Sequence, residues 1–114
     1  MSMAESARRI DAEEARRLVA SGEAKALDLR PDEEWQDSHL PGALHIPGAE
    51  LGSRLEEISE HKSLVLVGPE DEVERAIEEL GRQGHEACVL EGGMEAWASE
   101  DFPRQPSHDP DGPV

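Results

Sequence analysis

The sequence predicts an α/β protein in which a parallel sheet carries helices on both faces. Short apolar runs typical of buried strands alternate with stretches whose apolar residues are three and four apart, the spacing of an amphipathic helix. The clearest run is 64–67, Leu-Val-Leu-Val, which indicates a strand buried on both sides. Alternation of strands and helices along a chain favours a parallel sheet.

The stretch 63–80 contains that strand, a tight turn and a helix. Gly68 ends the apolar run, and Pro69 stands where a helix would begin, with a fixed φ and no N–H to leave unpaired. The first turn carries carboxylates, which favour the positive end of the helix dipole: Glu70, Asp71 and Glu72. The buried stripe that follows is Val73, Ala76, Ile77 and Leu80. Ligands of parallel sheets bind at the carboxyl ends of strands, so this turn is the first candidate site.

Four elements are expected before the loop 38–43. Residues 8–10 suit a short edge strand, and Asp11 with Glu14 three residues later is typical of a capping box that starts a helix. Ser21 and Gly22 end that helix. A buried strand is predicted over 24–29, and a short helix starting at Pro31 is predicted through about residue 37.

The remaining elements follow the loop 38–43. We expect a strand over 44–46 and an amphipathic helix over 49–60, where Leu51, Leu55 and Ile58 share a face. Gly81 and Gly84 end the central helix, and a strand is predicted over 85–90. After the turn at Gly92 and Gly93, a last short helix has its apolar residues at Met94, Trp97 and Ala98.

Composition limits the class of protein. The 114 residues suit one domain, expected over 8–100, with a frayed segment at 1–7 and a flexible proline-rich tail at 101–114. The net charge of -16 argues against nucleic acid and anionic membranes as partners. Cys88 is the single cysteine, so no disulfide can form within the chain, which fits a reducing compartment. No apolar run suits a membrane span or a secretory signal, so a cytoplasmic protein is expected.

At this point the chain resembles the single-domain rhodanese-like proteins. The resemblance is carried in order by residues 10–14, by Leu27-Asp28-Leu29-Arg30, by Glu34-Trp35, by 39–47 (His-Leu-Pro-Gly-Ala-Leu-His-Ile-Pro) and by 90–97 (Leu-Glu-Gly-Gly-Met-Glu-Ala-Trp). It covers roughly residues 8–100. It implies a three-layer sandwich around a five-stranded parallel sheet with helices on both faces.

The resemblance also implies where catalysis would occur. In the family, a six-residue loop of the form Cys-x-x-Gly-x-Arg follows the central strand, and its thiolate carries a sulfane sulfur. Backbone N–H groups and a helix N-terminus lower the thiol pKa in such a loop. Here the cysteine position is occupied by Gly68, or by Val67 if the loop is one residue shorter, and Arg75 falls inside the helix. The loop is interpreted as a remnant of the catalytic loop without a nucleophile, comprising Gly68, Pro69, Glu70, Asp71, Glu72 and Val73.

The other candidate residues are interpreted as structural. The family's motif residues expected in structural roles are Asp28, Arg30, Glu34, His39, Gly42, Gly92, Gly93 and Trp97. The family pairs its Arg and Glu, here Arg30 and Glu34, to hold the loop after the second strand. Cys88 suits a buried, inert strand residue. His39 and His45 with Asp37 match no standard metal site. Trp35 and Trp97 suit packing rather than a ligand cage.

Two functional hypotheses remain. In the first, the chain is a binding or regulatory module without sulfurtransferase activity, which meets an unknown protein or small ligand at the remnant loop. In the second, it is a sulfurtransferase that works through Cys88 or through a partner's cysteine. No cofactor is implied by either hypothesis, and the absence of a cysteine after the central strand favours the first.

Overall fold

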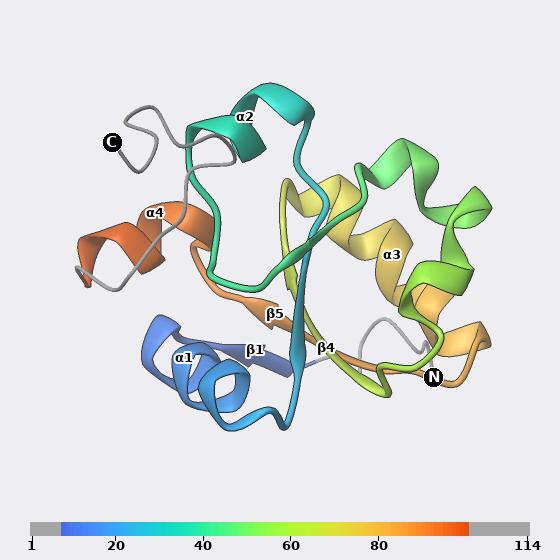
Figure 1. The fold of residues 1–114 in the computed structure, drawn as a ribbon, viewed down its shortest axis with the longest axis horizontal. Coiled ribbons are helices and arrows are strands. Elements are labelled where there is room, and N and C mark those ends of the chain that lie inside the picture. Colours follow the sequence, from blue (N-terminus) through green and yellow to red (C-terminus); the bar gives the residue numbers. More distant parts are fainter. Residues whose placement is uncertain (1–7, 101–114) are drawn as a thin grey trace, which may run out of the picture.

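The computed structural model describes residues 8–100, and five strands form one parallel sheet in them (Figure 1). The sheet order is β1-β5-β4-β2-β3. The strands are β1 (Arg8–Ile10), β2 (Lys25–Asp28), β3 (Leu44–His45), β4 (Ser63–Val67) and β5 (Glu86–Leu90). β4 therefore lies in the middle of the sheet, as its unbroken apolar run predicts. The predicted five-stranded parallel sheet is confirmed.

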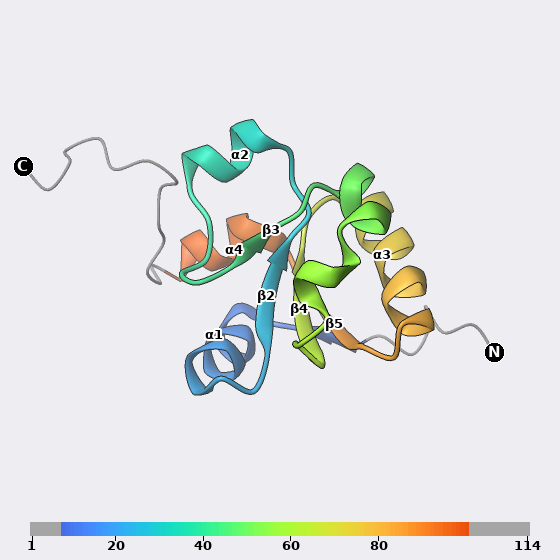
Figure 2. The same ribbon diagram turned by 45° about the vertical axis from the view of Figure 1, so that its right-hand side comes forward.

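Helices cover both faces of this sheet, so the protein has three layers (Figure 2). The helices are α1 (Ala12–Ser21), α2 (Asp32–Asp37), α3 (Glu70–Arg82) and α4 (Gly93–Ser99). α1 and α4 pack on one face, and α3 packs on the other together with two short 3-10 helices, η2 (Gly48–Ser53) and η3 (Leu55–Ile58). None of the helices in the described residues is long and apolar enough to cross a membrane.

The side chains of β4 alternate between two cores, because successive residues of a strand point to opposite faces. Leu64 and Leu66 join the cluster under α3, whereas Val65 and Val67 join the cluster under α1 and α4. All four are at most 1% exposed. Trp97 of α4 is 2% exposed and is the largest side chain in the second cluster. Burial on both faces explains why the sequence of this strand is apolar at every position and does not alternate between apolar and polar residues.

The helix ends follow from local chemistry. The Asp11 carboxylate accepts a hydrogen bond from the Glu14 backbone N–H at 2.9 Å, which caps α1 as predicted. Gly22 ends α1 in the left-handed region at φ 82°. α3 continues through Gly81 to Arg82, and Gly84 then takes φ +86°. Pro31 and Pro69 are both extended residues that directly precede α2 and α3.

The predicted helix over 49–60 is wrong in form. The segment contains η2 and η3, separated by Arg54, whose φ and ψ of -126° and 23° are not helical. The apolar spacing still predicts the buried face correctly, since Leu51 and Ile58 are buried. Glycines at positions 48 and 52 disfavour a continuous helix, and the Arg54 guanidinium donates to the His45 carbonyl. The segment therefore forms two short 3-10 helices instead of one α-helix.

The strands predicted over 24–29, 44–46 and 85–90 are each shorter in the structure.

Candidate functional site

The carboxyl end of β4 leads into α3 through only two residues, Gly68 and Pro69. The Val73 N–H already donates to the Pro69 carbonyl at 2.9 Å, so the first helical turn closes at once. The backbone of β2 approaches closely here, because the Leu29 N–H donates to the Val67 carbonyl at 2.8 Å. A Cβ added at Gly68 would lie 3.1 Å from the Leu29 Cβ. Glycine at position 68 thus permits the close approach of two strand ends.

The first turn of α3 is engaged with neighbouring side chains. The Glu70 carboxylate forms an ion pair with Arg9 of β1, and the same guanidinium lies 3.4 Å from Glu91. The Glu72 carboxylate lies against the Gly48 backbone and 3.2 Å from Arg75. Sequence reasoning missed Arg9, because a residue 61 positions from Glu70 leaves no local signal of the pairing. The Glu70 and Glu72 carboxylates are thus paired with arginines, and no side chain of the described residues caps the N-terminus of α3.

Asp28 and Arg30 form a buried pair at the end of β2. Asp28 is fully buried, and the Arg30 side chain is 11% exposed. The guanidinium donates to both carboxylate oxygens at 2.8–3.1 Å and to the Ser38 carbonyl at 2.7 Å. The expected pairing of Arg30 with Glu34 is wrong, because the guanidinium is taken by Asp28 and Glu34 is exposed. Arg30 still holds the loop after β2 in place, but it does so by binding the Asp28 carboxylate and the Ser38 carbonyl.

Trp35 is covered by two histidines. His39 stacks on the indole with ring centroids 3.4 Å apart, and His45 stacks at 4.6 Å, both with planes 5° apart. Two imidazoles so close to the ring centre could not fit side by side, so they cover opposite faces. His39 Nδ1 lies 3.0 Å from the Trp35 carbonyl, and His45 Nε2 lies 2.7 Å from the Arg30 carbonyl. The indole faces are therefore unavailable to a stacked ligand.

The motif glycines occupy turns that require them. Gly42, Gly92 and Gly93 all have positive φ, at 75°, 80° and 59°. A Cβ at Gly92 would also lie 2.8 Å from the Ala96 Cβ, inside the first turn of α4. Position 92 thus combines a left-handed backbone with close packing, which excludes other residues without a local shift.

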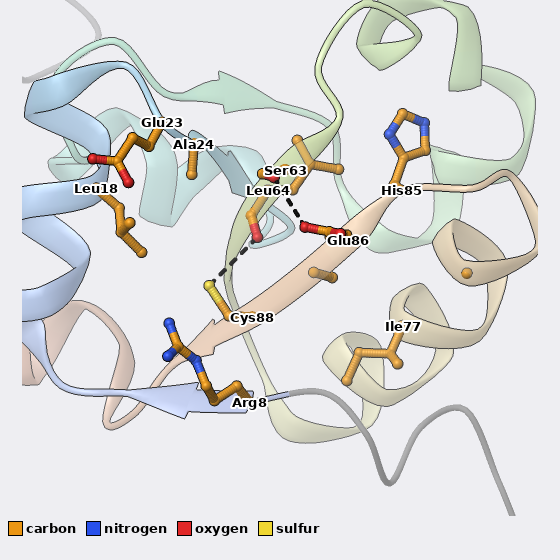
Figure 3. Close-up of a pocket in the computed structure, with 12 residues that line it drawn as sticks. Arg8, Leu18, Glu23, Ala24, Ser63, Leu64, Ile77, His85, Glu86 and Cys88 are labelled. Atoms are coloured by element: carbon orange, nitrogen blue, oxygen red, sulfur yellow. Dashed lines mark hydrogen bonds between the residues drawn. The ribbon is translucent and has the colours of Figure 1, made fainter.

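Cys88 lines a cavity of about 520 Å³ at the other end of the strands (Figure 3). Its Sγ lies 3.7 Å from the Leu64 carbonyl, and Arg8 is its partner across the β1–β5 pair. Burial raises the pKa of the Cys88 thiol above its ordinary value; Arg8 lowers that pKa and Glu14 raises it, both by less. The thiol is thus half-buried and less acidic than a free cysteine, and its strand partner in β4 is Val65, three residues before Gly68.

Metal-binding side chains do not gather in the part of the chain that the structure describes. No three His, Cys, Asp or Glu side chains of residues 8–100 lie close enough to hold a metal ion. His39 and His45 face Trp35, and Asp37 is exposed on α2.

The fold and this site geometry define an α/β sandwich with a two-residue turn after its central strand. The family model described as Rhodanese-like domain matches residues 11–100, and the chain belongs to this family. The solution structure of the rhodanese-like domain of Alr3790 from Anabaena sp. superposes with a TM-score of 0.71 at 27% identity, covering 90% of this chain and 83% of that one.

Two curated relatives bear different names. An "HTH-type transcriptional regulator Rv0324" of Mycobacterium tuberculosis (strain ATCC 25618 / H37Rv) is 35% identical in an alignment over 91 residues that covers 73% of this chain and 38% of the regulator. The "Putative sulfurtransferase YtwF" of Bacillus subtilis (strain 168) is 28% identical over 89 residues, covering 77% of this chain and 86% of YtwF. The chain therefore spans well under half of the first relative and most of the second.

Proposed function

We propose that this chain is a rhodanese-fold binding or regulatory module that does not transfer sulfur through a nucleophile of its own. The observation that carries the proposal is the two-residue connection between β4 and α3, Gly68 and Pro69. Neither residue has a nucleophilic side chain, and Val67 before them is 1% exposed and apolar. The family's catalytic cysteine has no counterpart at this position.

The electrostatics of the same edge support the proposal. A persulfide-forming site needs donors that stabilise a thiolate and bind an anionic sulfur donor. Here Glu70, Asp71 and Glu72 occupy the first turn of α3 and would repel both anions. Arg9, a cation near this turn, is already paired with Glu70 and Glu91. The edge suits contact with a partner better than sulfur chemistry.

The relatives support two candidate functions. Similarity to a regulator, of which the matching region is only part, supports a module that acts beside other sequence. Similarity to a protein named as a sulfurtransferase supports the second candidate, sulfur transfer through Cys88 or a partner's cysteine. Cys88 lines a cavity that Arg8 also lines, which favours this second candidate, whereas the raised pKa of its thiol disfavours it.

The deciding experiment is a thiosulfate-to-cyanide sulfur-transfer assay on the wild type and Cys88→Ala. We expect no activity above background in either protein. Wild-type activity that disappears in Cys88→Ala would establish the second candidate. Activity that persists in Cys88→Ala could not use a thiol of this chain, because the 114 residues contain no other cysteine, and would therefore reveal another sulfurtransferase in the preparation.

A second experiment asks whether the short connection itself prevents the chemistry. In Gly68→Cys, the new Cβ would press on Leu29 at 3.1 Å, so we expect a folded but slightly destabilised protein without turnover. Circular dichroism would check folding, and thiol titration would check exposure of the new cysteine. Turnover in Gly68→Cys would show that only the nucleophile is missing and that the two-residue connection can support catalysis.

A further inference from the structure

Both lysines of the chain, Lys25 and Lys62, line one cavity of about 470 Å³ at the amino ends of the strands. Lys25 begins β2 and Lys62 directly precedes β4, the neighbouring strand in the sheet. The turn at Gly42 forms another wall, since a Cβ added there would lie 4.0 Å from the Lys25 ammonium. His61 also lines the cavity. The parallel pairing of β2 and β4 thus brings together two cations that are 37 residues apart, from position 25 to position 62.

Neither lysine has a carboxylate partner within residues 8–100. In this part of the chain, no ammonium–carboxylate pair within 4.0 Å involves Lys25 or Lys62. Arginines elsewhere on the molecule behave differently, since Arg54 binds Glu50 and Glu57. Lys62 is exposed and Lys25 is half-buried, so an anion in the cavity can reach both side chains.

The carboxylates at this cavity do not cancel the two cations. Glu23 and Glu60 are the acidic residues that line it. Glu23 lies 3.6 Å from Arg17, which also binds Glu14, and Glu14 lies 3.7 Å from Arg8, so the two positive and two negative charges of this network cancel. Among the lining residues, only the exposed Glu60 then opposes Lys25 and Lys62. The cavity therefore carries a local positive excess on a molecule whose net charge is -16.

We propose that this cavity binds a small doubly charged oxyanion of the phosphate type between the Lys25 and Lys62 ammonium groups. Two ammonium groups supply up to six donors, and charge-assisted hydrogen bonds to phosphate oxygens are the strong class of such bonds. The site lies at the opposite ends of the strands from Gly68. It is independent of the function proposed for the remnant loop.

Phosphate binding to the full chain can be followed by amide chemical shifts in NMR. Inorganic phosphate is titrated at constant ionic strength against the wild type, Lys25→Gln/Lys62→Gln and Arg75→Gln/Arg82→Gln. The second double variant is the matched control, because it also removes two positive charges, from exposed α3 residues outside this cavity. We expect saturable shifts at residues 25, 42 and 62, and affinity at least about tenfold weaker in the lysine variant alone. Chloride in place of phosphate is expected to give no saturable shifts.

Three outcomes would overturn the site. Wild-type shifts that do not saturate, or that map away from the cavity, would show nonspecific contact. Equal weakening in both double variants would show an effect of net charge only. Unchanged phosphate binding in the lysine variant would show that other groups bind the anion.

Discussion

The buried pair of Asp28 and Arg30 shows how single residues hold the loop beside the candidate site. The carboxylate is fully buried and receives the Arg30 guanidinium and the Arg30 backbone N–H, which is 3.0 Å from Oδ1. The guanidinium then reaches the Ser38 carbonyl beyond α2. One side chain thus connects the end of β2 to the end of α2, which fixes both ends of the intervening segment.

Substitution of Asp28 by alanine would leave a largely buried guanidinium without its anion. We expect Asp28→Ala to lower the free energy of unfolding by about 3 kcal/mol, measured by urea denaturation. Arg82→Ala, which removes an exposed pair with Glu79, is the control and should change stability far less. A loss for Asp28→Ala no larger than that of the control would contradict a supporting role for the buried pair.

The pH dependence of Cys88 follows from its raised thiol pKa. Because the folded pKa exceeds the unfolded one, the folded protein holds this proton to higher pH. Its contribution to stability is present below the ordinary thiol pKa and is lost as pH rises through the folded value. We expect the iodoacetamide labelling rate of the native protein to rise at a higher pH than that of the urea-unfolded chain. A native midpoint at or below the unfolded one would contradict the burial effect.

Helices and strands agree with the sequence-based prediction where interactions between residues close in the chain determine them. The Asp11 cap, the proline starts of α2 and α3 and the buried stripe of α3 are all predictable, because each depends on residues within a few positions. In the segment 48–58, which departs from its prediction, Arg54 is not helical, its guanidinium donates to the His45 carbonyl, and Gly52 has a low helix propensity. Periodicity indicates which residues are buried, and it does not distinguish one helix from two short turns.

The end of α3 gives a test at the element scale. Gly84 has φ +86° and open space where a Cβ would lie, so Gly84→Ala adds backbone strain without a steric clash. We expect a loss of about 1 kcal/mol in the free energy of unfolding. Gly52→Ala is the matched control, because position 52 also has open space but no positive φ. Equal effects of the two substitutions in thermal and urea unfolding would contradict a strain that is specific to Gly84.

The whole molecule carries a net charge of -16, which opposes its compact state through self-repulsion. Raising NaCl from about 0.01 M to about 1 M shortens the screening length from roughly 30 Å to roughly 3 Å. We expect the melting temperature to rise by about 5 °C, or about 1 kcal/mol for a domain of this size. Trehalose at matched osmolality controls for effects other than screening. A melting temperature that falls with salt would mean that ion pairs such as Glu70–Arg9 outweigh the repulsion.

The sequence by itself determined the alternation of strands and helices, the central place of β4, the family and the absence of a cysteine after that strand. These properties depend on composition and on residues close together in the chain, so they can be inferred from the sequence alone. The tertiary structure alone decided that Arg30 binds Asp28, that Arg9 reaches Glu70, that Leu29 presses against Gly68 and that both lysines share a cavity. Each of these contacts depends on the order of the strands in the sheet or on which of several possible partners a side chain meets. The spacing of residues along the chain predicts neither the strand order nor the partner.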